Sequence, residues 1–339
     1  MEIAKPFIRL PFSFDADQLA REVGNFPADA WMPHPLGLPG NLAIPLVSRD
    51  GEDNDDFHGR MDVTRHLRAA PYTRQVMAAF GEVLGRSRLM RLDPGCEVPE
   101  HIDFNYHWYT RVRIHVPVIT DPSVTFYCAD DSVHMKPGEC WIFNSWQRHR
   151  VVNAGQKTRI HLVIDTAGSS RFWRTVRRMQ QFDALADASA IDALAERVSF
   201  DPQQKPQILT EQFNVAPVMS PGEIDGLVGS LVDDFAHHPD NDPQRITHYT
   251  NLLNDFARDW RETWHLHGNG PAGWPLYEAV IARVRGQLYP DPRALITRSN
   301  QVGVNRIIVQ RILNAALATG QYDRFQAPQP EAPCRLTNP

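Results

Sequence analysis

The sequence predicts a mainly β domain with some helix, followed by a helical C-terminal domain. Between Arg88 and Asp165, short runs alternate apolar and polar residues, which is the period-two pattern of half-buried strands. From Ser170 onward, apolar residues recur instead at the three- and four-residue spacing of amphipathic helices. We therefore expect a β domain over residues 1–169 and a helical domain over residues 170–326.

The residues before Arg88 carry the elements that precede the main strands. Asp15 can cap a short helix, because its side chain can accept a hydrogen bond from the first helical turn. The acidic loop Gly51–Asp56 resembles a calcium-binding loop but lacks its terminal glutamate, which favours a solvated turn. The other elements expected here are a strand over Phe7–Phe12, helices over Asp15–Val23 and Tyr72–Leu84, and a strand over Arg88–Leu92.

The strand expected over Tyr109–Val118 has two unlike faces. Alternation places Arg111, Arg113 and His115 on one face, and apolar residues on the other, namely Val112, Ile114 and Val116. A strand with a cationic inner face favours an anionic ligand, although the same side chains could pair with acidic residues across the core. The sequence does not decide whether Arg111 or Arg113 contacts a ligand.

Turn-forming and helix-capping residues mark the ends of the remaining elements. The Pro137-Gly138 pair predicts a turn, and Ser220 with Glu223 forms a capping box at the start of a helix. The strands expected are Ser123–Cys128, Ser132–Met135, Cys140–Asn144 and Thr158–Asp165. The helices expected are Arg171–Phe182, Ala190–Val198, Ser220–Phe235, Ile246–His265, Pro275–Leu288 and Gly303–Thr319.

Three side chains have the types and order of a metal site. His101 and Asp103 are two residues apart, so on an extended backbone they point to one face and can share an ion. His149 follows after several strand-like runs. Two histidines and one carboxylate on one face are the ligand set of non-haem iron(II) oxygenases, which leaves open coordination positions for a 2-oxo acid and dioxygen.

An arginine follows this set on the next strand. The far carboxylate of 2-oxoglutarate would be buried in the interior, and a buried charge needs a fixed partner. The guanidinium group pairs with a carboxylate through two parallel hydrogen bonds and stays charged. Arg159 is the candidate for this role.

Together these motifs resemble the aspartyl/asparaginyl β-hydroxylase family of iron(II)/2-oxoglutarate oxygenases. The residues that carry the resemblance are His101-x-Asp103, Arg113-Ile-His115-Val-Pro, His134-Met-Lys-Pro-Gly138-Glu139-x-Trp141, His149, Asn153 and Arg159-Ile-His-Leu-Val-x-Asp165. Because it has Asp103, the sequence resembles the bacterial branch of this family, which includes proline hydroxylases. The resemblance implies a double-stranded β-helix, a cupin-like jelly roll.

The resemblance also implies cofactors and residue roles. Fe(II), the cosubstrate 2-oxoglutarate and O2 are implied, with iron ligands at His101, Asp103 and His149. A salt bridge from Arg159 to 2-oxoglutarate is implied. Arg113 and His115 are expected near the metal-binding end of the cosubstrate or near a substrate carboxylate.

Each of these assignments has a simpler alternative. His101 and Asp103 alone would fit a surface turn, but the addition of His149 and Arg159 in this order favours metal binding. His161 shares a strand face with Arg159 and could line the pocket or be a hydrogen-bonded core histidine. The His265-x-His267 pair falls at a helix end, where histidine favours the helix dipole rather than a metal.

Three functions remain open from the sequence. The first is hydroxylation of a free amino acid such as proline, with the helical half closing the pocket or forming a homodimer. The second is hydroxylation of a peptide residue such as aspartyl or asparaginyl, of a carrier-bound residue, or of a lipid headgroup. The third is a cupin-type metal-binding protein without oxygen chemistry, which Arg159 argues against.

Composition excludes some partners. The 339 residues carry a formal net charge of −5 without a basic patch, which disfavours nucleic acid as a partner. No apolar run approaches the roughly 20 residues of a membrane span. The first residues have no signal-peptide core, so we expect a cytoplasmic protein. The proline-rich tail, residues 327–339, is expected to be disordered.

Overall fold

The computed structural model describes residues 3–319 in two compact units. The first unit consists of the chain up to Ile102 together with Thr110–Asn214. The second consists of Asp103–Tyr109 together with the chain from Val215. The tail predicted to be disordered lies outside the described residues. Within residues 3–319, no helix is both long enough and apolar enough to span a membrane.

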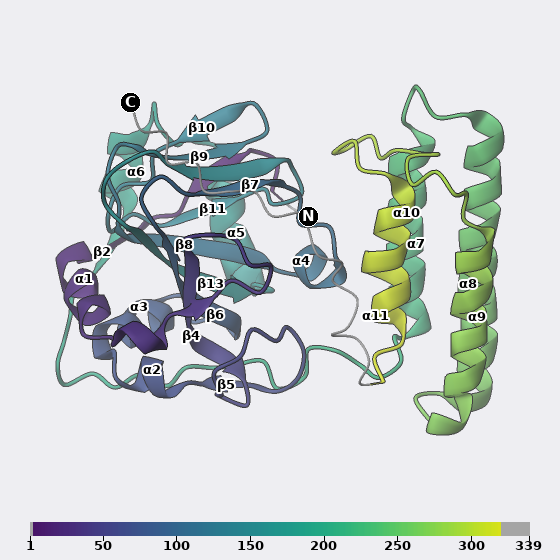
Figure 1. The fold of residues 1–339 in the computed structure, drawn as a ribbon, viewed down its shortest axis with the longest axis horizontal. Helices are drawn as coiled ribbons and strands as arrows, with labels where there is room; N and C mark the ends of the chain where they lie inside the picture. The colour runs from purple at the N-terminus through teal and green to yellow at the C-terminus, as the bar shows by residue number, and fades with distance from the viewer. Residues whose placement is uncertain (1–2, 320–339) are drawn as a thin grey trace. The chain divides into compact units, whose positions relative to one another are not determined.

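An eight-stranded antiparallel sheet forms the larger layer of the first unit (Figure 1). Its order is β1-β11-β8-β13-β6-β4-β3, and β5 pairs with β4. The strands are β1 (Phe7–Arg9), β3 (Met32–Pro33), β4 (Asn41–Arg49), β5 (Met61–Val63), β6 (Leu84–Leu92), β8 (Val112–Ile119), β11 (Trp141–Phe143) and β13 (Arg159–Thr166). Strand β13 is buried along its whole length, because both faces of the sheet are covered.

A four-stranded antiparallel sheet forms the second layer, in the order β10-β9-β12-β7. Its strands are β7 (Glu97–His101), β9 (Val124–Cys128), β10 (Asp131–Val133) and β12 (His149–Asn153). The two sheets share one apolar cluster that includes Phe7, Leu92, Trp141, Phe143, Val124, Phe126, Val133 and Val151. The chain alternates between the two sheets from β6 to β9 and again from β11 to β13, and two antiparallel sheets connected in this way form a jelly roll. The predicted mainly β jelly-roll core is therefore confirmed.

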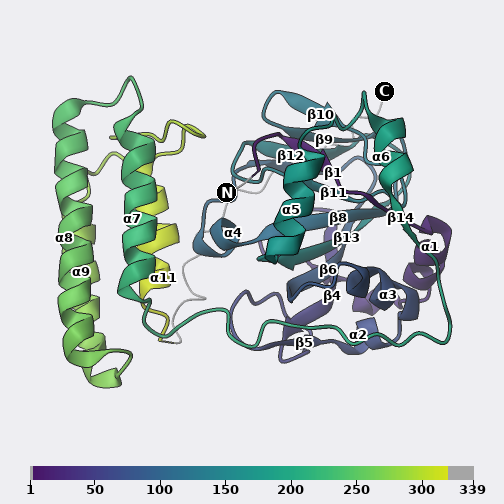
Figure 2. The ribbon, with the colours of Figure 1, turned by 180° about the vertical axis from the view of Figure 1, so that it is seen from behind.

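Helices cover the outer face of the large sheet (Figures 1 and 2). They are α1 (Ala16–Gly24), α2 (Arg65–Arg68), α3 (Pro71–Ala79) and α5 (Ser170–Met179), with a short 3-10 turn at Ala28–Ala30. The Asp15 side chain accepts a hydrogen bond from the Gln18 backbone amide at 2.9 Å, as the helix-cap prediction required. The apolar outer face of the central strands meets these helices through Ile114, Val116, Leu162, Ile164, Leu19, Val76 and Val176.

The alternation on β8 and β13 separates two environments. On β8, Val112, Ile114 and Val116 join the outer cluster, as predicted. The neighbouring positions on β8 and β13 therefore face the space between the two sheets. This inner face carries Arg113 and His115. The register aligns Val163 with His115 and Asp165 with Arg113, so polar side chains from both strands share the interior.

The division of the chain differs from the one expected near residue 170. Helix α5 buries Phe172, Val176 and Met179 in the outer cluster of the first unit, and α6 (Ala188–Leu194) buries Ile191 there. Strand β14 (Glu196–Val198), where a helix was expected to end, pairs in parallel with β2 (Phe12–Phe14). The first unit therefore extends to Asn214. The helical pattern began at 170 because α5 covers a sheet, not because a new core starts there.

The second unit is helical. Its helices are α4 (Tyr106–Thr110), α7 (Pro221–Ala236), α8 (Pro243–His267), a 3-10 turn (Pro271–Gly273), α9 (Trp274–Gln287), α10 (Val304–Ile307), a π-helical turn (Ile308–Leu313) and α11 (Asn314–Ala316). The side chain of Ser220 accepts a hydrogen bond from the Glu223 amide, which confirms the predicted cap of α7. Apolar stripes on α7, α8 and α9 bury Leu231, Phe235, Phe256, Trp260 and Tyr277.

Candidate active site

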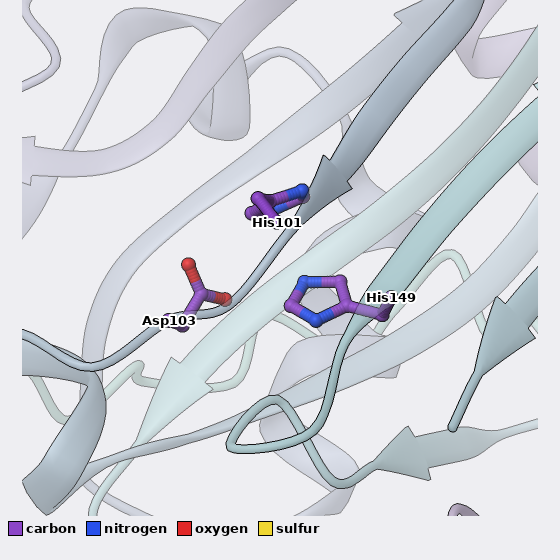
Figure 3. A group of neighbouring side chains, drawn as sticks. All are labelled: His101, Asp103 and His149. Carbon is purple, nitrogen blue, oxygen red and sulfur yellow. The ribbon is translucent and has the colours of Figure 1, made fainter. Parts of the chain in front are cut away.

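Three predicted residues, His101, Asp103 and His149, come together at one end of the small sheet (Figure 3). His101 is the last residue of β7 and His149 is the first residue of β12, and the antiparallel register places them opposite each other. Asp103 lies two residues beyond the end of β7. One ligand atom from each of the three side chains lies within 4.8 Å of the other two. The pairing of two strand ends, not local sequence, therefore brings the two histidines together.

Backbone carbonyls orient both imidazoles. The Nδ1 atom of His101 lies 2.7 Å from the carbonyl oxygen of Pro99, and Nδ1 of His149 lies 2.9 Å from that of Gln147. A carbonyl oxygen only accepts hydrogen bonds, so each Nδ1 carries the proton and each Nε2 carries the lone pair. This tautomer and a carbonyl partner are the usual arrangement of a metal-binding histidine.

The donor set suits a divalent first-row metal. His149 and Asp103 are buried, with relative exposures of 2% and 8%. Two neutral imidazoles and one carboxylate supply three ligand atoms to a cation that keeps further positions open. Within residues 3–319 this is the one group of three or more histidine, cysteine or acidic residues placed to share an ion.

Arg159 begins β13 and is only 4% exposed. Burial lowers the pKa of its guanidinium group to about 9. Its Nε atom is buried and makes no hydrogen bond to another described residue. A buried cation without a counter-ion is costly. A bound anion would compensate this buried charge.

A cavity adjoins Arg159, and its walls are mostly apolar. Its lining is Thr120, Val124, Phe126, Val133, Met135, Val151, Arg159 and His161. The hydroxyl of Thr120 is buried and makes no hydrogen bond to a described residue. Thr120 therefore adds a donor beside Arg159. Sequence reasoning missed Thr120, and the available signal was strand register: Ile119 pairs with Ile160, which places Thr120 at the level of Arg159.

Two buried histidines lie farther along the same interior face. His115 and His161 have ring centroids 5.9 Å apart. Burial and the nearby charge of Arg159 hold the pKa of both far below the usual value. Both rings are therefore neutral at physiological pH. Because Arg113 and His149 also lower the pKa of His115, that ring has both an arginine and the candidate metal site as neighbours.

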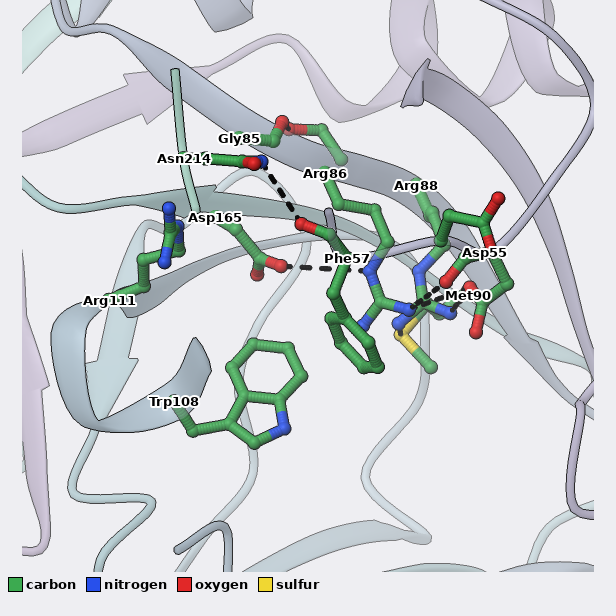
Figure 4. A network of polar contacts seen from close by, with 12 residues as sticks. Asp55, Phe57, Gly85, Arg86, Arg88, Met90, Trp108, Arg111, Asp165 and Asn214 are labelled. Carbon is green, nitrogen blue, oxygen red and sulfur yellow. Dashed lines mark hydrogen bonds and ion pairs between the residues drawn. The ribbon is translucent and has the colours of Figure 1, made fainter. Parts of the chain in front are cut away.

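A charged network occupies the interior face near the end of β13 (Figure 4). Arg86 on β6 lies 2.8 Å from an oxygen of Asp55, which also pairs with Arg88. The Nε atom of Arg86 lies 3.8 Å from the Asp165 carboxylate. Burial and the charge of Arg88 lower the pKa of Arg86 to about 10. The face therefore presents both signs of charge at this end.

The loop that supplies Asp55 is not a purely solvated turn, contrary to expectation. The Phe57 ring lies 3.9 Å from the guanidinium carbon of Arg86. The side chain of Asn214 donates a hydrogen bond to the Phe57 carbonyl at 3.0 Å and accepts one from the Gly59 amide at 2.9 Å. Sequence reasoning missed these residues, because the contacts of this loop with Arg86, Arg88 and Asn214 join segments that are distant in the sequence.

The arginines of the predicted cationic strand have different surroundings. Arg111 forms a buried two-point ion pair with Glu211, with N–O distances of 2.8 and 2.9 Å. Its charge is thus matched within the chain. Arg113 instead lowers the pKa of both Arg86 and His115. Arg113 therefore lies close to Arg86 and His115, whereas the charge of Arg111 is matched by Glu211.

Comparison with known proteins gives matches to the β domain. Residues 49–168 match the family described as aspartyl/asparaginyl β-hydroxylase. L-proline cis-3-hydroxylase 2 from a Streptomyces species is 24% identical over 184 residues, which cover 49% of this chain and 60% of that protein. The match thus spans 60% of that relative's length, which is less than two thirds.

Solved structures of low similarity also match. One is an oxidoreductase of the 2OG-Fe(II) oxygenase family from Burkholderia pseudomallei, with 12% identity and a TM-score of 0.36 over 48% of this chain and 85% of that one. Another is a Pseudomonas putida prolyl-4-hydroxylase, with 14% identity and a TM-score of 0.33 over 48% of this chain and 92% of that one. The family match falls on residues 49–168, which contain most of the motifs on which the predicted resemblance rests.

Proposed function

We propose that this protein is an Fe(II)/2-oxoglutarate-dependent dioxygenase that hydroxylates an amino-acid-type substrate and converts 2-oxoglutarate to succinate and CO2. The observation that carries the proposal is Arg159, a buried cation that lacks a counter-ion among the described residues. It lies on the interior face that also adjoins the His101, Asp103 and His149 cluster. An oxoacid that bridges these two features would satisfy both.

In this proposal the three clustered side chains hold the iron. The carbonyls of Pro99 and Gln147 keep the two imidazoles in the tautomer that presents Nε2. When bound, iron with 2-oxoglutarate and O2 supplies the oxidising power to insert oxygen into an unactivated C–H bond. The chain itself orients the reactants and excludes water.

Arg159 and Thr120 would hold the far carboxylate of 2-oxoglutarate. The guanidinium group offers a charge-assisted two-point contact, and the threonine hydroxyl offers a third donor. The apolar walls of the cavity, among them Phe126, Val133 and Met135, would keep water from competing for these donors. Arg113 and neutral His115 would lie near the metal-bound end of the cosubstrate or near a substrate carboxylate.

A small zwitterionic substrate is our first choice. The network of Arg86, Arg113, Asp55 and Asp165 presents groups of both signs, which suits the carboxylate and ammonium of a free amino acid. The similarity to an L-proline cis-3-hydroxylase makes proline the first compound to test. A peptide or carrier-bound residue is the alternative. A cupin-type protein without oxygen chemistry is disfavoured, because it would leave the charge of Arg159 uncompensated.

The test is succinate release by protein loaded anaerobically with Fe(II) and then given 2-oxoglutarate and O2. Each free amino acid is added in turn, with His149→Ala as the inactive control. Stimulation by one amino acid, with a product heavier by one oxygen atom, would support hydroxylation of a free substrate. Slow succinate release without stimulation would direct the search to peptides and carrier-bound residues. No succinate from protein shown to hold iron would contradict the proposal.

A further inference from the structure

Strand β13 carries a second buried polar side chain two residues after Arg159. His161 is only 2% exposed, and neither of its ring nitrogens makes a hydrogen bond to a described residue. A neutral imidazole has one donor and one acceptor nitrogen, and a buried polar group without a partner is destabilising and rare. His161 is therefore not the hydrogen-bonded core histidine that the sequence allowed, and a bound molecule would supply the missing partner.

The imidazole of His161 lines the cavity that adjoins Arg159. Side chains two residues apart on a strand point to the same face, so the guanidinium group and the imidazole face this cavity from one strand. The buried hydroxyl of Thr120 lines the cavity too and makes no hydrogen bond to a described residue. Three polar side chains with unused hydrogen-bonding groups therefore share one cavity. Its other walls are apolar, namely Val124, Phe126, Val133, Met135 and Val151.

The order of side chains along the interior face places His161 next to Arg159 and away from the candidate metal ligands. Strand register places His115 level with the position two residues beyond His161 on β13. The centroid of the His115 ring lies 5.9 Å from that of His161 and 5.4 Å from that of Phe143. The Phe143 ring in turn lies 4.8 Å from the His149 ring. His161 thus stands at the Arg159 end of a row of rings that leads to the metal site.

Arg159 is the one charged side chain among the residues that line this cavity. Burial and the nearby charge of Arg159 hold the pKa of His161 well below its usual value, so the imidazole is neutral at physiological pH. A single carboxylate group would therefore balance the charge of the cavity. The neutral N–H can donate to that carboxylate without adding a second buried charge, and hydrogen bonds to charged groups are stronger than those between neutral groups.

We infer that His161 is a second anchor for the far carboxylate of 2-oxoglutarate, which it contacts together with Arg159 and Thr120. This inference rests on the proposed function and adds a cosubstrate-binding residue to it. Its consequence is selectivity among 2-oxo acids. Acids that end in a second carboxylate should gain affinity from His161, whereas acids that end in a methyl group should not.

The test compares two ligands that differ only at the far end. 2-Oxopentanoate keeps the 2-oxo acid group of 2-oxoglutarate but has a methyl group in place of the far carboxylate. The Kd of each is measured by isothermal titration calorimetry on the full chain loaded anaerobically with Co(II), a substitute for Fe(II). We expect His161→Leu to raise the Kd for 2-oxoglutarate by about 10- to 150-fold, the range for loss of a hydrogen bond to a charged group. The Kd for 2-oxopentanoate should be unchanged.

Further variants separate hydrogen bonding from packing. His161→Gln keeps an N–H donor on a side chain of similar reach, so it should recover most of the affinity for 2-oxoglutarate that His161→Leu loses. Leu162→Met is the matched control, because Leu162 is the next residue on β13 but packs on the opposite face, in the outer cluster. This volume-conserving change should leave the Kd of both ligands as in the unmodified protein. If His161→Leu does not fold, as judged by circular dichroism, His161→Phe carries the test because it keeps a planar ring.

Two results would overturn the inference. An unchanged Kd for 2-oxoglutarate in His161→Leu would show that the imidazole does not contact the far carboxylate. An equal rise in the Kd for 2-oxoglutarate and for 2-oxopentanoate would show that His161 acts through the shape of the cavity instead. A loss of affinity that is confined to 2-oxoglutarate and restored in His161→Gln would support the inference.

Failure of the proposed function would be recognised separately. If the unmodified protein does not bind 2-oxoglutarate, or if Arg159→Met binds it equally well, the anion site is wrong and the inference fails with it. If binding of 2-oxoglutarate depends on both Arg159 and His161 but the iron-loaded protein releases no succinate, the inference stands and the oxygenase proposal is wrong.

Discussion

Replacement of Arg159 by methionine should have opposite effects on the ligand-free and ligand-bound protein. Burial lowers the pKa of Arg159 to about 9, which corresponds to about 5 kcal/mol of unfavourable burial of the charged form. Methionine keeps much of the side-chain volume and removes the charge. The ligand-free Arg159→Met variant should therefore be more stable than the unmodified protein, and a gain of only about 1 kcal/mol would raise Tm by about 2–4 °C.

The same substitution should nearly abolish binding of 2-oxoglutarate. Loss of one partner of a buried, hydrogen-bonded charge pair costs about 2–5 kcal/mol. This range corresponds to a rise in the Kd for 2-oxoglutarate of about 30-fold to several-thousand-fold. The stabilisation that 2-oxoglutarate gives to the unmodified protein should disappear accordingly.

Thermal unfolding with and without 2-oxoglutarate measures both effects in one assay. The control is Arg91→Met, which removes an arginine from β6 that is partly exposed and paired with Asp93 at 2.6 Å. This control should leave the response to 2-oxoglutarate unchanged. A ligand-free Arg159→Met protein of lower stability, combined with an undiminished response to 2-oxoglutarate, would refute the assignment of Arg159 as an anion site.

Three further predictions follow from the site. Asp103→Ala should remove one of three proposed ligands and abolish turnover, so iron content and succinate release should fall together; full activity would contradict the ligand assignment. Thr120→Val should remove one hydrogen bond worth about 1–3 kcal/mol, which raises the KM for 2-oxoglutarate about 5- to 150-fold with little change in kcat. Burial lowers the pKa of His161 in the folded protein. As the pH falls below about 6.5, the ordinary pKa of histidine, the imidazole of His161 is therefore protonated in the unfolded chain before it is protonated in the folded one. The free energy of unfolding should therefore decline as the pH falls below that value, and the decline should be smaller in His161→Phe. Urea titrations at pH 7 and pH 5 measure the free energy of unfolding of both proteins. An equal decline in the two proteins would contradict the burial of a neutral ring.

Local sequence was enough to predict the residues whose positions depend on strand alternation. The faces of the strand with Arg113 and His115 were predicted correctly, because side chains alternate strictly on a pleated strand. The order of His101, Asp103 and His149 predicted a cluster, and the pairing of β7 with β12 brought its two histidines together.

The residues that were missed depend on contacts between distant segments. Asp55 pairs with Arg86 and Arg88 across a loop, and Thr120 reaches the level of Arg159 only through the register of two strands. Neither relationship has a local sequence signal. The boundary near residue 170 was misplaced for a related reason, since α5 has the periodicity of any amphipathic helix and its sequence does not reveal which core it covers.

The most direct measurement of the central claim is turnover of the iron-loaded protein under isotopically labelled oxygen gas, read by mass spectrometry. The proposal predicts succinate that carries one labelled oxygen atom and, with the right amino acid, a hydroxylated product that carries the other. Both signals should be lost in His149→Ala. Iron-loaded protein that consumes no 2-oxoglutarate, or that forms succinate without the label, would contradict the proposal.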